Sequence, residues 1–172
     1  ALHKQWKDVI DKGLRIYALS SDKNVARIII EDSFTFIEKR TEPTRILIED
    51  KKFKGNVFSI IKILVNNSPF IMDSITSLFS EYNLRIEFVI HPIFTVERDK
   101  QGNIISIKGP LDIGDKELLI YACVNYIPDS VKKEINKKSK KAIAESLIAK
   151  QDFEKIKQEL KTIVRNLNDP IY

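Results

Sequence analysis

The chain has 172 residues, 43% hydrophobic and 31% charged, a balance that fits one folded domain with helical extensions and excludes intrinsic disorder. The net charge of +5 equals that of residues 132–141 alone, which hold six lysines and one glutamate, so the remaining chain is neutral and an extended nucleic-acid surface is not expected. The single cysteine, Cys123, cannot form a disulfide within the chain and fits a cytoplasmic location, and no apolar run approaches the ~18 residues of a membrane span.

The first 43 residues are predicted to form an N-terminal helical extension. Residues 3–17 carry apolar side chains at helical spacing, and a second amphipathic helix spans about 22–40, with the Ser20-Ser21 pair as its candidate cap. The run Ile28–Ile30 also fits a β-strand, so periodicity alone leaves both alternatives open.

The central region, residues 44–150, is predicted to form one α+β domain. Arg45–Glu49 is a short strand candidate, and residues 51–56 form a loop with Gly55 at its turn. Val57–Val65 is the strongest strand candidate. It is apolar on both faces, which predicts a central strand covered from both sides.

A helix is predicted to follow this strand. Ser68 is a suitable N-cap, and Pro69 suits the first helical position because its missing N–H would be unpaired there anyway. The helix is expected to run to Tyr82, with Asn83 as a left-handed stop.

Three further strands are predicted. The segment 85–97 alternates apolar and polar residues, but Pro92 has no N–H to donate to a sheet, so a bulge or a sheet edge is expected there. Residues 104–107 form a hairpin with it, and 117–127 form the last strand.

Two separate helices are predicted at the end of the chain. One is lysine-rich, begins after Pro128 and covers about 130–147; its role stays open. The other is a C-terminal amphipathic helix within 151–172, defined by an apolar stripe. The stripe consists of Phe153, Ile156, Leu160, Ile163 and Leu167.

The predicted order of strand, helix, three strands and helix is a ferredoxin-like arrangement, with helices packed on its β-sheet. The sequence contains no glycine-rich phosphate loop and no zinc-binding or redox cysteine motif. With two histidines and one cysteine, we expect neither catalytic residues nor a metal site in this chain.

Two segments, 65–75 and 84–92, resemble the N-terminal ACT-like regulatory region of the large NAD-specific glutamate dehydrogenases. The residues that match in order and spacing are Asn66, Pro69, Phe70, Asp73, Ser74, His91, Pro92, Arg98, Asp99 and Gly102. The family usually has an acidic residue in place of Asn67 and a methionine in place of Ser68. The sequence does not place the closing strand of an ACT unit, and Arg45–Glu49 is expected to serve as an edge strand instead.

The resemblance implies a parent enzyme of amino-acid catabolism that oxidatively deaminates glutamate to 2-oxoglutarate. NAD would be the cofactor of that parent, with no cofactor bound in this segment. Because the chain starts at Ala1 rather than Met, we expect a piece of the longer protein.

In ACT-like domains, amino-acid effectors tend to bind at the loop between the first strand and the first helix. The residues expected to bind an effector here are Asn66, Asn67, Ser68, Phe70, Ile71 and Asp73. The N–H groups of Phe70 and Ile71 would face the ligand carboxylate, and Asp73 would take its ammonium group. The alternative interpretation is that these residues only start a helix.

The sequence therefore predicts a non-catalytic regulatory or assembly segment. Its expected partners are other domains or subunits of the parent enzyme and an amino-acid effector, with neither nucleic acid nor membrane among them. A purely structural interaction domain is the first alternative. A ferredoxin-like nucleic-acid-binding module is the second, although the aromatic strand motif of RNA-recognition modules is missing.

Overall fold

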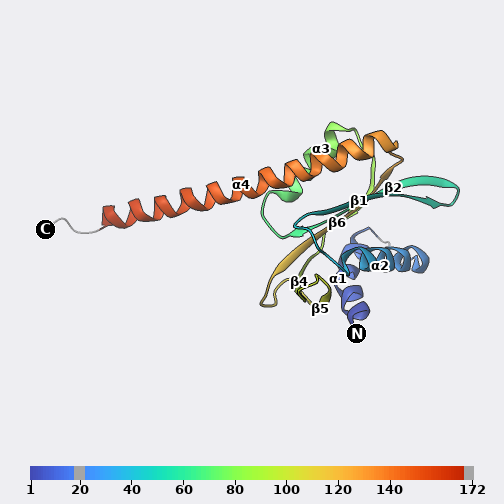
Figure 1. Cartoon of the computed structure of the whole chain (residues 1–172), viewed down its shortest axis with the longest axis horizontal. Helices are drawn as coiled ribbons and strands as arrows, with labels where there is room; N and C mark the ends of the chain where they lie inside the picture. The colour runs from blue at the N-terminus through green and yellow to red at the C-terminus, as the bar shows by residue number, and fades with distance from the viewer. Residues whose placement is uncertain (18–21, 169–172) are drawn as a thin grey trace.

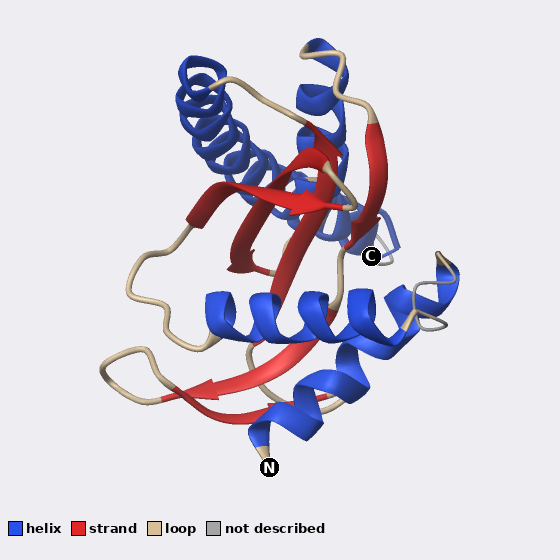
Figure 2. Cartoon of the chain, turned by 90° about the vertical axis from the view of Figure 1, so that its right-hand side faces the viewer, coloured by secondary structure: helices blue, strands red, loops and turns tan. Residues whose placement is uncertain are grey.

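A six-stranded antiparallel sheet lies between two pairs of helices in the computed structural model, which describes residues 1–17 and 22–168 (Figures 1 and 2). The helices are α1 (Leu2–Ile16), α2 (Lys23–Ile37), α3 (Ile71–Glu81) and α4 (Asp129–Asn168). The strands are β1 (Arg45–Phe53), β2 (Asn56–Asn66), β3 (Ile86–Ile90), β4 (Ile93–Arg98), β5 (Ile104–Lys108) and β6 (Lys116–Asn125). The predicted α+β class with a ferredoxin-like sheet is confirmed.

The sheet has the strand order β1-β2-β6-β4-β5, and β3 also pairs with β6. The predicted strand 85–97 is thus two strands: β3 pairs with the second half of β6, and β4 with its start. They are separated at Pro92, where the sequence predicted a bulge or a sheet edge within one strand. The Pro92 carbonyl still accepts a hydrogen bond from the Leu119 N–H (3.1 Å), so the two strands follow one another along β6.

The place of the closing ACT strand is taken by β1, which precedes β2 in the chain. β1 and β2 form a hairpin whose two turn residues, Lys54 and Gly55, have φ values of 49° and 80°. Positive φ at both positions is the requirement of the tightest hairpin turns. The turn at Gly55 is therefore confirmed, but the predicted loop 51–56 is too long, because the strands continue to Phe53 and resume at Asn56.

Apolar side chains fill both faces of the sheet. Toward α1 and α2 the core contains Trp6, Ile10, Leu14, Ile29, Phe36, Ile60, Leu64, Phe94 and Leu119. Toward α3 and α4 it contains Ile61, Ile63, Val65, Ile71, Ile75, Phe79, Ile120, Ala122, Ile135 and Ile143. The central position of β2 between two covered faces is confirmed.

The segment Ile28–Ile30 lies in α2, so the helical alternative is the correct one. The carboxylate of Asp22 caps this helix by accepting hydrogen bonds from the N–H groups of Asn24 and Val25. The predicted Ser20-Ser21 cap lies outside the described residues. Both N-terminal helices share a core with the sheet, and the division of the chain after residue 43 stays a prediction.

The C-terminal region is one 40-residue helix, α4, rather than the two predicted helices. The prediction of separate helices was wrong because nothing between Asp129 and Asn168 stops a helix: the segment contains neither glycine nor proline. Its first half packs on α3 and the sheet, whereas residues 151–168 are exposed and the C-terminal half projects away from the body (Figure 1). Among the described helices, none is both long and apolar enough to cross a membrane.

Candidate functional site

The loop between β2 and α3 differs from its predicted form at the helix start. The helix begins at Ile71 rather than Pro69, and Phe70 precedes it in a left-handed conformation with φ of 75°. The Ser68 hydroxyl does not cap the helix; it is buried and has no hydrogen-bond partner among the described residues. At the other end of the helix, Asn83 adopts the predicted left-handed conformation with φ of 51°.

The six predicted ligand residues differ in their exposure to solvent. Asn66, Phe70 and Asp73 are exposed, Asn67 is half-buried, and Ser68 and Ile71 are buried. The Ile71 side chain belongs to the core, so this residue can offer a ligand only its backbone. Asp73 lies in the first turn of α3, as predicted.

Backbone hydrogen bonds also shift by one residue from the predicted arrangement. The Ser74 N–H donates to the Phe70 carbonyl (3.0 Å), which is the first bond of the helix. The N–H groups of Ile71, Met72 and Asp73 therefore precede the helical ladder, as in the first turn of any α-helix. An anion at this loop would be bound there rather than by Phe70.

A nearly buried ion cluster anchors the start of the β2–α3 loop through Asn66. The Glu117 carboxylate accepts two hydrogen bonds from Arg98, at 2.9 and 2.8 Å, and lies 3.1 Å from Nη1 of Arg40. The same Arg40 nitrogen donates to Oδ1 of Asn66 (2.8 Å). The Glu117 side chain is 5% exposed, and this single carboxylate forms ion pairs with both arginines. Asn66 is thereby tied to the rigid part of the sheet.

The turn after β4 closes this cluster. Gly102 has φ of 88°, and a Cβ atom there would lie 2.0 Å from the Arg40 carbonyl oxygen. Its own carbonyl accepts hydrogen bonds from the Arg40 N–H (3.0 Å) and from Nη1 of Arg98 (2.7 Å). Only glycine allows the Arg40 backbone to come this close, which explains why a glycine occupies the turn.

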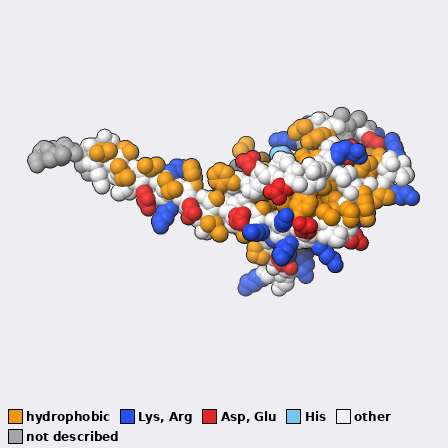
Figure 3. Space-filling view, turned by 90° about the horizontal axis from the view of Figure 1, so that it is seen from above, with side chains coloured by type: hydrophobic (Ala, Val, Ile, Leu, Met, Phe, Trp, Pro, Cys, Tyr) orange, Lys and Arg blue, Asp and Glu red, His pale blue; other side chains and the backbone are white. Residues whose placement is uncertain are grey.

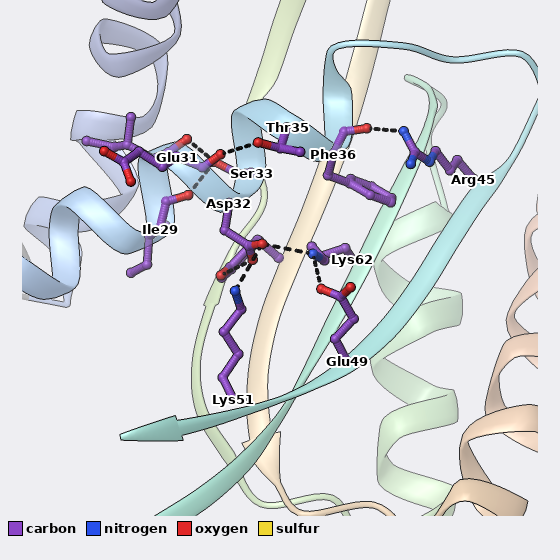
Figure 4. Close-up of polar contacts among 12 residues, drawn as sticks. Ile29, Glu31, Asp32, Ser33, Thr35, Phe36, Arg45, Glu49, Lys51 and Lys62 are labelled. Carbon is purple, nitrogen blue, oxygen red and sulfur yellow. Dashed lines mark hydrogen bonds and ion pairs between the residues drawn. The ribbon is translucent and has the colours of Figure 1, made fainter. Parts of the chain in front are cut away.

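A second charged cluster lies on the same face of the sheet, beneath α2 (Figure 4). Nζ of Lys62, on a side chain only 3% exposed, contacts Asp32 (3.1 Å) and Glu49 (2.7 Å). Asp32 also contacts Lys51 (3.1 Å) and accepts a hydrogen bond from the Tyr121 hydroxyl (2.7 Å). The cluster joins α2 to β1, β2 and β6.

The protonation of this cluster follows from its partners. Burial disfavours the charged form of Asp32, but Tyr121 and Lys62 outweigh it and hold the pKa of Asp32 below its usual value. Burial, together with the Asp32 carboxylate, raises the pKa of Tyr121 far above its usual value. Asp32 is therefore the charged acceptor of the pair, and Tyr121 the neutral donor.

The model of one family, the glutamate dehydrogenase ACT1 domain, matches residues 32–148, about two thirds of the chain. The chain belongs to this family. No curated protein and no solved structure is detectably similar to the chain.

The matched region of the ACT1 domain begins within α2 and ends within the packed half of α4. It includes the whole sheet and both charged clusters. The first helix, α1, and the projecting half of α4 lie outside it. The resemblance to the N-terminal ACT-like region of glutamate dehydrogenases is thereby confirmed.

Sequence reasoning missed the roles of Arg40, Glu117 and Lys62 in this ACT1 domain. Two of them carried a signal, because Lys62 and Glu117 are charged residues within or beside otherwise apolar strands. A charge in such a position needs a buried partner. The partners of Lys62 and Glu117 come from distant segments of the chain, so the pairs can be identified only in the folded structure. Among the described residues, no group of three or more potential ligands is placed to hold a metal ion.

Proposed function

We propose that this ACT1 domain is a non-catalytic regulatory or assembly segment of an NAD-specific glutamate dehydrogenase. The observation that carries the proposal is the family match across the complete sheet, α3 and the adjoining parts of α2 and α4. The parent enzyme would convert glutamate to 2-oxoglutarate in the cytoplasm, with NAD bound elsewhere in its longer chain. The partners of this segment would be other domains or subunits of that enzyme.

The β2–α3 loop supports a regulatory role. The unpaired N–H groups of the first turn, with the partial positive charge of a helix N-terminus, suit a carboxylate. Asp73 is exposed beside them and suits an ammonium group. Phe70 adds a strained left-handed backbone, a feature that clusters at ligand-binding sites. An α-amino acid carries both charged groups that this loop would accommodate.

Amino-acid binding at this loop should depend on Asp73. We expect isothermal titration with a panel of amino acids to find a ligand of modest affinity, because a small ligand buries few atoms. Asp73→Ala should weaken it about tenfold, the equivalent of one lost charge contact. Glu159→Ala, farther along the exposed part of α4, is the control and should change nothing. Binding unaffected by Asp73→Ala would remove Asp73 from the site, and absence of any ligand would favour a structural role.

The segment by itself is predicted to be inactive. Incubating the purified chain with glutamate and NAD should give no NADH above a blank, because the sequence has no glycine-rich dinucleotide loop. The measurement is the NADH absorbance over time, with an active glutamate dehydrogenase as the positive control. NADH formation by the chain would contradict the assignment as a non-catalytic segment.

The alternative of a purely structural interaction domain is favoured by the projecting half of α4. Its apolar side chains recur at helical spacing and are half or more exposed, and hydrophobic groups follow one another along this helix (Figure 3). These are Phe153, Ile156, Leu160, Ile163, Val164 and Leu167. Burying each is worth ~1.5–3 kcal/mol, so the stripe favours contact with another domain or a second chain.

The stripe should govern self-association of the isolated chain. The double variant Leu160→Glu, Ile163→Glu should weaken self-association at least about tenfold, because charges would enter an apolar contact. Its melting temperature should stay unchanged, since both side chains are half exposed outside the body. Gln158→Glu, on the same exposed helix, is the control. Sedimentation equilibrium measures the effect; a monomeric parent chain with residues 153–167 unprotected in hydrogen exchange would contradict the prediction.

The nucleic-acid alternative has less support. RNA-recognition modules stack bases on aromatic side chains of an open sheet face. Here α1 and α2 cover one face of the sheet, and α3 and α4 cover the other (Figure 2).

A further inference from the structure

A groove of about 620 Å³ lies between α1, which packs beside β5, and the connection from β3 to β4 (Figure 1). Most of its lining is apolar, with Ile16 of α1 and Ile93 of β4 among the residues. The described lining also contains two lysines, Lys12 of α1 and Lys108 at the end of β5, and one carboxylate, that of Asp8. A groove of this size and composition is suited to apolar side chains that are accompanied by negative charge.

The loop from β5 to β6, residues 109–115, presents two aliphatic side chains to solvent. Leu111 is 97% exposed and Ile113 is 99% exposed, the highest values of any large apolar side chain that the structure describes. Pro110, beside them, is exposed as well. Neighbouring apolar side chains that are left this open to water are characteristic of a surface that binds another protein.

Hydrogen bonds fix the backbone of this loop on the sheet. The Thr95 hydroxyl donates to the carbonyl oxygens of Gly109 (2.8 Å) and Asp112 (3.3 Å). Nζ of Lys116 donates to the same Asp112 carbonyl (2.7 Å). Gly114 has φ of 141°, and a Cβ atom there would lie 2.9 Å from the Thr95 methyl group. The loop is therefore ordered before it binds, and an ordered loop loses little conformational entropy on binding.

The charges of the loop are opposite to those of the groove. Asp112 and Asp115 are exposed on the loop, and Lys12 and Lys108 are exposed at the groove. None of these four side chains takes part in an ion pair within the described part of the chain. All four are therefore available to a partner, and complementary charges beside an apolar contact favour one orientation of the two surfaces.

We propose that this loop inserts Leu111 and Ile113 into the groove of a second copy of the chain, which inserts its own loop in return. The two acidic residues of each loop would then meet Lys12 and Lys108 of the other copy. The contact buries the most exposed aliphatic side chains of both copies and pairs the charges of loop and groove at the same time.

The position of the loop next to the groove makes this exchange reciprocal. Gly109 and Pro110 line the groove and also begin the loop. Ile113 is four residues beyond Gly109, so it lies no more than ~14 Å from the groove wall. A two-fold axis close to Gly109 places each loop over the groove of the other copy, and a contact of this kind closes as a dimer.

The contact is separate from the α4 stripe and does not rest on the function proposed above, so it is tested in the Leu160→Glu, Ile163→Glu background, which removes the stripe contact. Sedimentation equilibrium should show this chain as a dimer. Adding Leu111→Ser, Ile113→Ser should weaken dimerisation at least about a hundredfold. Ile148→Ser, at a 58% exposed position of α4, is the control. A background chain that stays monomeric at about 1 mM, or a dimer that survives the loop variant, would overturn the proposal and leave the stripe prediction unaffected.

Exchanging the charges tests the pairing itself in the same background. One variant, Lys12→Glu, Lys108→Glu, makes the groove acidic, and a second, Asp112→Lys, Asp115→Lys, makes the loop basic. Each should be monomeric alone because like charges meet, whereas an equimolar mixture should dimerise because both halves of the mixed dimer pair opposite charges. All four positions are exposed, so the fold should persist, which circular dichroism verifies. Failure of the mixture to associate, or dimerisation of either variant as tight as that of the background chain, would show that these surfaces do not meet.

Discussion

Replacing Trp6 with alanine is expected to destabilise the chain by about 3–5 kcal/mol, the usual cost of removing a large buried aromatic side chain. Trp6 is fully buried on α1. Its Nε1 donates to the Ser33 hydroxyl on α2 (2.9 Å), and its ring meets Phe94 of β4 edge-on, with 5.0 Å between centroids. One side chain thus joins both N-terminal helices to the sheet.

Urea unfolding followed by far-UV circular dichroism measures this effect. Trp6→Phe should cost less than alanine because an aromatic ring still fills most of the space. Ile16→Ala, at a position on the same helix that is 80% exposed, should change the unfolding free energy by no more than about 0.5 kcal/mol. A cost below about 1 kcal/mol for Trp6→Ala would mean that α1 is a dispensable extension. The result therefore tests the predicted division after residue 43.

Replacing Glu117 with alanine is expected to destabilise the chain by a similar amount, about 3–5 kcal/mol, because it leaves two nearly buried arginines without their carboxylate. Arg98 and Arg40 would keep their backbone carbonyl partners, among them those of Gly102 and Pro43. Those carbonyls accept hydrogen bonds, but they do not neutralise a charge. Asn66 depends on the same Arg40, so the β2–α3 loop should also lose order.

The comparison of three variants separates charge from shape. Glu117→Gln keeps the size of the side chain and some hydrogen bonds, so it should cost less than alanine. Glu154→Ala, on the exposed half of α4, should cost no more than about 0.5 kcal/mol. Hydrogen exchange at residues 66–73 reports the loop directly. If Glu117→Ala unfolds at the same urea concentration as the parent chain, the cluster does not stabilise the fold.

Local chemistry explains the features that were predictable from the sequence. Apolar residues on both faces of β2 predicted a strand covered from both sides. Gly55 predicted a turn, and Asn83 predicted a left-handed end of the helix. Pro92 predicted a bulge or a sheet edge at the position where β3 and β4 separate. Each of these depends on a residue and its immediate neighbours, so it can be read without knowledge of the fold.

Other features were decided only by tertiary structure. Ser68 and Pro69 form a standard helix start, yet the chain continues two residues further and starts α3 after a left-handed Phe70. Ile71 is fully buried in the core that α3 and the sheet share, and packing of this kind overrides local capping preferences. The predicted ligand site stays a prediction, and the N–H groups that would face an anion there are those of Ile71, Met72 and Asp73.

The sequence by itself determined the α+β class, most strands and the family resemblance, because periodicity and turn residues act over a few positions. Tertiary structure decided which charges meet. Glu117 finds its arginines 19 and 77 positions away, and Lys62 finds Asp32 30 positions away. It also decided that β1 closes the sheet and that the core faces of α1 and α2 cover it. Long-range pairing of this kind depends on the geometry of the whole sheet, which no local pattern contains.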